Sequence, residues 1–183
     1  MMFPSPPRPV SKPGSIGCSG IMTAKLQRAA CRVCLALILG LLVVSGYVVA
    51  PQLFAHASSR MVAGMLAGHI FHLANSALLL LALACAAFWL RLQSAGEAVG
   101  RLRWLLLAAL ALLVAANEWG LAPQMEAVKA LMPHGYDALA ADDPLRARFG
   151  MLHGISAIMH LLASLLAAVL VAMGSGTTTV EQG

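Results

Sequence analysis

Two pairs of histidines are the residues in this sequence best suited to chemistry. His69 and His72 stand three residues apart, and His153 and His160 stand seven apart. In a helix, both spacings place the two imidazoles of a pair on roughly one face. Imidazoles arranged in this way can ligate haem iron or another metal ion. The spacing therefore supports the hypothesis of a haem-binding or redox membrane protein that uses these histidines.

Methionines near the histidines support a second metal hypothesis. Met65 and Met61 precede His69 by about one and two helical turns, and Met151 lies close to His153. Thioether and imidazole ligands together suit copper. We favour a third interpretation, in which these side chains line contacts between helices and no cofactor is expected. Haem and copper stay open as alternatives.

Asn117 and Glu118 are a further polar feature of the apolar part of the chain, next to Trp119. Ionisable groups inside spanning helices are costly and usually face a bundle interior or water. Glu118 is a candidate proton carrier. The interpretation that we favour is a hydrogen-bonded carboxylate near the membrane surface.

The four cysteines do not predict a disulfide framework. Cys18 lies in a Pro/Ser/Gly-rich segment, and Cys31, Cys34 and Cys85 fall inside or beside apolar runs. Cys31-x-x-Cys34 is compatible with a redox or metal pair, but the sequence holds no second such motif. We favour small apolar packing for these thiols.

Several kinds of chemistry lack their motifs in this sequence. It contains no glycine-rich phosphate loop, no Ser-His-Asp order and no basic patch with interleaved aromatics. The net charge of +5 comes from lysines and arginines beside the apolar runs, where they indicate topology and contact with anionic lipid. We therefore expect a lipid bilayer, and no nucleic acid, as partner.

Four apolar runs must position all of these residues. The chain is 60% hydrophobic and 10% charged, with a mean hydropathy of +0.83, which is outside the range of soluble domains. Runs of about 18 or more apolar residues predict membrane-spanning helices. We expect an all-α integral membrane four-helix bundle over residues 29–173, with helices at about 29–50, 61–92, 102–122 and 149–173. Residues 1–28 are predicted to form a disordered tail, and 174–183 a short polar one.

The first run allows two interpretations. A basic lead, an apolar stretch and Ala55-His56-Ala57 resemble a cleaved signal peptide. The run is longer than a usual signal core and three more follow it, so we favour a retained helix. Met22 is an alternative start, because Lys25, Arg28 and Arg32 would then form a compact basic lead.

Basic residues predict the topology. They precede the first helix and flank the turn between the second and third, whereas the loop after the first helix holds only Arg60. By the positive-inside rule both termini are cytoplasmic, and we expect a multi-pass protein of the bacterial inner membrane.

This topology brings several polar and turn residues to one depth. The ends of the first and third helices and the start of the fourth lie near the outer surface, with His160 about 10 Å deeper than His153. We therefore predict a functional cap on the outer side, formed by Pro51, Phe54, Asn117, Glu118, Pro123, His153, Gly154 and Ser156.

Four short stretches resemble a known family. They are Val49–Phe54, Ala63-Gly64 with Gly68 and Phe71, Asn117 followed by Pro123-Gln124-Met125, and Phe149–Ser156. Together they cover roughly residues 30–173 and resemble the small four-helix membrane proteins of uncharacterised function related to eukaryotic transmembrane protein 205.

This resemblance implies four transmembrane helices and no established activity. Pro51, Phe54, His153, Gly154 and Ser156 match the family pattern, whereas His69, His72 and His160 do not belong to it, which weakens both metal hypotheses. We expect a non-enzymatic integral membrane protein that handles a small solute or metal or supports a membrane complex. A homo-oligomer is expected if a solute passes through it, because four helices enclose little interior.

Overall fold

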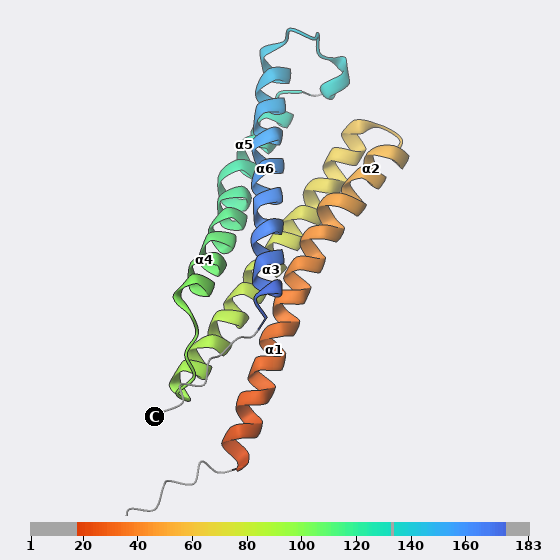
Figure 1. The fold of residues 1–183 in the computed structure, drawn as a ribbon. Coiled ribbons are helices and arrows are strands. Elements are labelled where there is room, and N and C mark those ends of the chain that lie inside the picture. The colour runs from red at the N-terminus through yellow and green to blue at the C-terminus, as the bar shows by residue number, and fades with distance from the viewer. Residues whose placement is uncertain (1–17, 133, 175–183) are drawn as a thin grey trace, which may run out of the picture.

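The structure, a computed structural model, describes residues 18–132 and 134–174 as helices joined by short turns (Figure 1). In chain order the helices are α1 (Cys18–Val43), η1 (Val44–Val49), α2 (Ala50–His56), α3 (Arg60–Ser94), α4 (Arg101–Ala115), η2 (Ala116–Leu121), α5 (Ala122–Ala130), η3 (Tyr136–Ala138) and α6 (Pro144–Ala172). The prediction of an all-α fold is confirmed.

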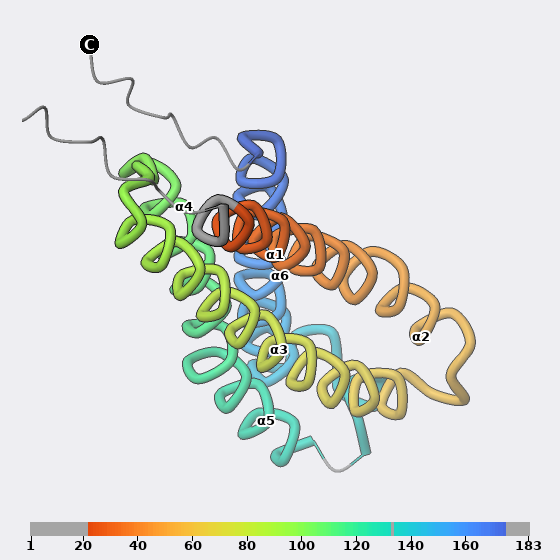
Figure 2. The backbone as a smooth tube through the Cα atoms, turned by 90° about the horizontal axis from the view of Figure 1, so that it is seen from below, coloured from red at the N-terminus to blue at the C-terminus, as the bar shows by residue number. Residues whose placement is uncertain are grey.

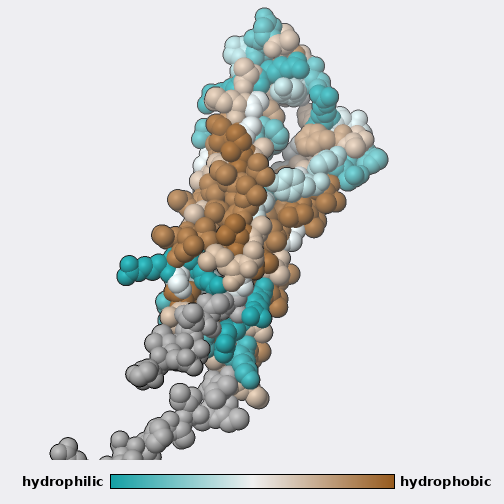
Figure 3. Space-filling view, viewed as in Figure 1, coloured by the Kyte–Doolittle hydropathy of each residue, from teal (hydrophilic) through white to brown (hydrophobic). Residues whose placement is uncertain are grey.

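Within the described residues, four continuous helical stretches are long and apolar enough to cross a membrane. They are Met22–His56, Arg60–Ser94, Arg101–Ala130 and Pro144–Ala172. Figure 3 shows apolar side chains in a broad band over the middle of one face, with hydrophilic residues above and below. Leu80, Leu83 and Leu112 are each about two-thirds exposed, which is the exposure expected where lipid rather than water covers the surface.

The first and third stretches run further than the sequence predicted, because the helix continues through each proline. Pro51 lies in the first turn of α2 and Pro123 in the first turn of α5, directly after the π-helical segments η1 and η2. A proline within an α-helix lacks the N–H donor and clashes with the preceding turn. The wider π turn rearranges the local hydrogen bonds, and the chain stays helical. Expected ends near residues 50 and 122 become His56 and Ala130.

Capping side chains stabilise the starts of α3 and α6. Ser59 Oγ accepts a hydrogen bond from the Val62 amide at 3.2 Å at the start of α3, and Asp143 Oδ1 accepts from the Leu145 amide at 2.8 Å at the start of α6. Helix α6, the last of the four long stretches, therefore begins at Pro144, earlier than the predicted residue 149. Of the predicted N-terminal tail, residues 1–17 lie outside the described part and 18–28 are helical. Of the predicted C-terminal tail, only Gly174 is described.

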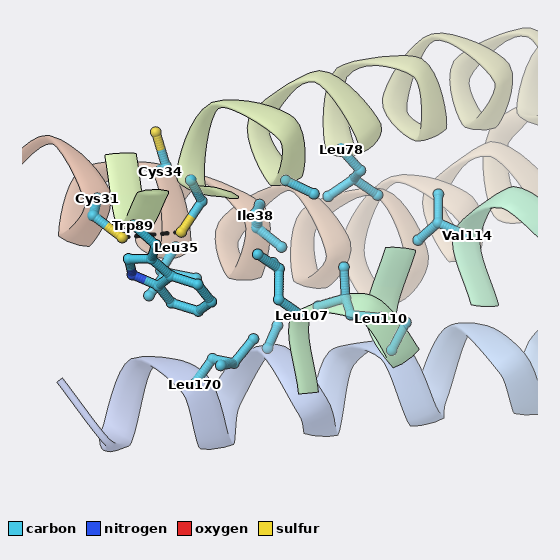
Figure 4. Close-up of a cluster of buried hydrophobic side chains, with 14 of the residues drawn as sticks. Cys31, Cys34, Leu35, Ile38, Leu78, Trp89, Leu107, Leu110, Val114 and Leu170 are labelled. Carbon is cyan, nitrogen blue, oxygen red and sulfur yellow. Dashed lines mark hydrogen bonds between the residues drawn. The ribbon is translucent and has the colours of Figure 1, made fainter. Parts of the chain in front are cut away.

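The four stretches pack as two hairpins, α1–η1–α2 with α3 and α4–η2–α5 with α6, that cross one another (Figures 1 and 2). Ile38, Leu42, Leu78, Leu110 and Leu170 come from all four stretches and are at most 1% exposed. Figure 4 shows several of them meeting in one cluster. Removing a buried leucine from such a core costs about 2–5 kcal/mol.

The two ends of the bundle differ. One end carries Arg28, Arg91 and Arg101 together with the end of α6, and we call it the basic end. The other holds the turns between α2 and α3 and between α5 and α6, and we call it the loop end. At the loop end α2 lies apart from α5 and α6 in both views (Figures 1 and 2).

Candidate functional site

Glu118 is the centre of the polar residues inside the bundle. It lies on η2 and is 8% exposed. Its Oε2 accepts a hydrogen bond from Asn75 Nδ2 at 2.8 Å. Its Oε1 is paired with Nδ1 of His72. A buried carboxylate is thus held by two side chains from α3.

Local helix geometry explains this arrangement. His72 and Asn75 are three residues apart on α3 and therefore lie on neighbouring positions of one face. On the other side, Glu118 lies in the wide turn of η2, which directs it to α3. The His72 side chain is 73% exposed and that of Glu118 is 7% exposed. His72 therefore connects the buried carboxylate to the surroundings of the protein.

Distances along the helices give the position of the site relative to the basic end. Along the helix axis, Glu118 is about 25 Å from Arg101, and His72 is about 28 Å from Arg91. A bilayer core is about 30 Å thick. If the basic end marks one membrane surface, the carboxylate sits a few ångströms inside the other.

A second polar contact joins η2 to the fourth spanning helix. Ser156 Oγ donates a hydrogen bond to Asn117 Oδ1 at 2.7 Å. Asn117 and Glu118 are adjacent, so η2 is tied to α6 by one side chain and to α3 by the next. The start of α5, with Pro123, follows directly and packs on α6.

His160 makes the matching contact with the first spanning helix. Its Nε2 donates a hydrogen bond to the Leu42 carbonyl oxygen at 2.9 Å. Its ring packs against Tyr47 and Phe71, with centroids 5.8 and 5.6 Å away. A Cβ atom on Gly46 would lie 2.2 Å from His160 Nε2. Only a glycine at position 46 leaves room for this ring.

A small cavity lies between these contacts. It has a volume of about 10 Å³ and is lined by Asn75, Asn117 and His160, together with apolar side chains that include Leu42 and Val114. This is room for about one water molecule, and polar partners are available for it. Asn75 both lines the cavity and binds Glu118, so the cavity adjoins the carboxylate.

The residues of the predicted cap do not all meet. Asn117, Glu118 and Ser156 come together, while Pro51 and Phe54 lie exposed on α2. His153 is exposed and stacks on Phe149, with ring centroids 6.2 Å apart. Gly154 is half-buried one residue further along α6.

The histidines of the metal hypotheses have separate surroundings. His72 is paired with Glu118, His160 binds a backbone carbonyl, and His69 is exposed on α3. Within the described residues, no group of three or more His, Cys, Asp and Glu side chains is placed to hold a metal ion. Haem and copper remain untested hypotheses.

The sequence reasoning missed Asn75 and both π-helical segments, although a repeat in the sequence marks them. Ala-Pro-Gln occurs at residues 50–52 and again at 122–124, each time directly after a π segment. Gly-Met-Leu-x-Gly occurs at 64–68 and at 150–154, in the following helix of each hairpin. The two hairpins therefore repeat one pattern.

The repeat shows that only one of the two hairpins carries a carboxylate at the position of Glu118. Glu118 lies four residues before the second Ala-Pro-Gln, and Gly46 lies four residues before the first, so the two positions correspond. In the second hairpin this position carries the carboxylate that pairs with His72 of the first. In the first hairpin it carries the glycine that admits His160 of the second. Each π segment thus receives a histidine from the other hairpin. His72 meets a carboxyl side chain there, whereas His160 meets a backbone carbonyl.

Comparison with known proteins gives one match. Residues 33–134 match the family described as "Domain of unknown function (DUF4149)". The search of curated proteins and the search of solved structures each found no match. The matched range includes Glu118, His72 and both π segments but not α6. It provides no link to eukaryotic transmembrane protein 205, and that part of the resemblance stays a prediction.

Proposed function

Because the chain belongs to the DUF4149 family, whose description assigns no function, we propose one from its own polar site. The protein is a non-enzymatic multi-pass membrane protein that binds a small cationic solute at Glu118. The observation that carries this proposal is the buried Glu118 carboxylate, which lies within the apolar length of a helix long enough to span a membrane. Among the described residues, two side chains hold it.

The free-energy cost of burying a carboxylate in the hydrocarbon region argues for a binding role. A charged group in the hydrocarbon region is expensive, and a neutral amide could make the same packing contacts at lower cost. Asn75 supplies one neutral donor, and the remaining partner, His72, is largely exposed. A cation that displaces the His72 ring from Oε1 would find an oxygen ligand on a side chain that is 7% exposed, and electrostatic attraction is stronger at a buried group than in water.

The size of the interior restricts the solute. The adjoining cavity has room for about one water molecule, so a bare or singly hydrated monovalent metal cation is the class that fits. A continuous pathway is closed on the basic side by the buried cluster of Ile38, Leu42 and Leu110. Passage through the membrane would therefore require a second copy of the chain or a different arrangement of the hairpins, and we propose a homo-oligomer for that reason.

The charges of the described residues support the proposed orientation. Lys25, Arg28 and Arg32 on α1 and Arg91, Arg101 and Arg103 around the α3–α4 turn all belong to the basic end. The positive-inside rule places that end in the cytoplasm. We propose a bacterial inner-membrane location, with the Glu118 site open to the outer side through His72.

A hydrophobic carbodiimide tests the site directly, because it partitions into the bilayer and modifies protonated carboxyl groups there. In the full-length protein in lipid vesicles, we expect modification of Glu118, detected by mass spectrometry of its peptide. Sodium or potassium should slow the modification relative to choline at equal ionic strength, because a bound cation excludes both the proton and the reagent.

Glu126 provides a matched control. It lies on α5 of the same stretch, and its side chain is 64% exposed beside Lys129. Glu118→Gln should abolish the cation-sensitive modification, and Glu126→Gln should leave it unchanged. If Glu118 is not modified, or if its modification rate is the same in sodium, potassium and choline, the proposed binding function is wrong.

A further inference from the structure

A second group of reactive side chains lies near the basic end, far from Glu118. Cys31 on α1 and Cys85 on α3 point toward each other with their Sγ atoms 2.9 Å apart. They are 1% and 0% exposed. Figure 4 shows this contact as a dashed line, with the sulfur of Cys34 directed away from it. The structure therefore pairs Cys31 with a cysteine of the next spanning helix rather than with its Cys-x-x-Cys neighbour.

The surroundings of the two thiols are apolar but close to the aqueous phase. Trp89 and Leu92 of α3 and Leu35 of α1 belong to the same buried cluster. About one helical turn further toward the basic end, Arg28 forms an ion pair with Glu97 at 3.4 Å. At exposures of 1% and 0%, both thiols are screened from direct attack by a peptide-sized thiol or disulfide, so an oxidant must be small to reach them.

We propose that Cys31 and Cys85 form a reversible dithiol–disulfide site that is oxidised by small hydroperoxides. One thiol loses its proton, and the thiolate attacks the peroxide O–O bond and becomes a sulfenic acid. The hydroxide that leaves takes up that proton and forms water. The second thiol attacks the sulfenic sulfur, and water leaves as the S–S bond forms. In sum, two thiols and one hydrogen peroxide yield one disulfide and two waters. The two sulfur atoms lose the two electrons that the peroxide gains.

Proximity makes the second step fast relative to competing reactions. The resolving thiol is already in contact with the attacked sulfur, so no diffusion or large rearrangement is needed. The product joins α1 to α3 across 54 positions of sequence. The disulfide would link the first two long helices covalently near the basic end, and it would not involve the Glu118 site.

The test uses the full-length protein in lipid vesicles with pairs of cysteines retained. In one variant Cys18→Ser and Cys34→Ser leave Cys31 and Cys85. In the matched control Cys18→Ser and Cys31→Ser leave Cys34 and Cys85, and Cys34 is one turn from Cys31 on the same helix. Each is treated with hydrogen peroxide, blocked with maleimide in denaturant, reduced and labelled with a heavy maleimide.

We expect the first variant to acquire two heavy labels per monomer on a denaturing gel, and to lose them if dithiothreitol is added before blocking. The control should acquire them at least about ten times more slowly. Oxidised glutathione should give little labelling in either variant. The proposal is overturned if peroxide yields no disulfide, if the bond joins two chains, or if the control oxidises as fast.

Discussion

Gly46→Ala is the substitution for which the structure gives the sharpest expectation. The new methyl group would lie 2.2 Å from Nε2 of His160 and 2.6 Å from its Cδ2. The ring has no easy escape, because Nε2 is bound to the Leu42 carbonyl and two aromatic rings pack against it. The imidazole must therefore leave its place or the two helices must separate.

The expected cost can be worked out from these contacts. Overpacking of a well-packed site costs about 1–3 kcal/mol, and loss of the hydrogen bond to Leu42 adds about 1 kcal/mol. Replacing glycine by alanine within a helix returns up to about 1 kcal/mol. We expect Gly46→Ala to lower the free energy of unfolding by about 1–3 kcal/mol, measured by denaturant titration in detergent micelles.

Two further variants separate this mechanism from a general effect of the methyl group. Gly40 lies on the same helix, and among the described atoms a Cβ there would meet nothing within 4 Å. Gly40→Ala should be neutral or stabilising. With His160→Ala already present, Gly46→Ala should cost much less, because the ring that it clashes with is gone. If Gly46→Ala is as harmless as Gly40→Ala, or if its cost is unchanged without His160, the reasoning is refuted.

Three other substitutions have definite expected outcomes. Leu110→Ala should lower the free energy of unfolding by about 2–5 kcal/mol because its side chain is 1% exposed, whereas Leu112→Ala, at a side chain 70% exposed, should cost little in the same titration. Ser156→Ala should lower the free energy of unfolding by about 1 kcal/mol, because it removes the 2.7 Å hydrogen bond to Asn117 Oδ1. A change smaller than the error of the titration would contradict that. His72→Ala should speed carbodiimide modification of Glu118, because the ring that occupies Oε1 is gone. An unchanged rate would show that the pair does not restrict access.

Some parts of the fold could be predicted because they depend on local composition. Four runs of apolar residues define four long helices wherever their neighbours lie, since each spanning helix satisfies its own backbone hydrogen bonds. The histidine and glutamate positions were also recognised as unusual, because a polar group in such a run is conspicuous in the sequence itself.

Other parts of the fold were harder to predict. Helix ends were expected near residues 50 and 122, directly before Pro51 and Pro123. A π segment instead precedes each proline, and the chain stays helical through it. The Ala-Pro-Gln repeat after both segments shows that the information was present in the sequence, but only the coordinates reveal what the repeat encodes.

By itself, the sequence determined that this is a chain of four apolar helices with polar residues concentrated in a few places. Only the tertiary structure decided which of them meet. Glu118 pairs with His72 and Asn75, which are more than 40 residues away, and Cys31 meets Cys85 rather than Cys34. Spacing along one helix reports which residues share a face. It cannot report which face of another helix lies opposite, because that depends on the crossing and rotation of the helices when they pack.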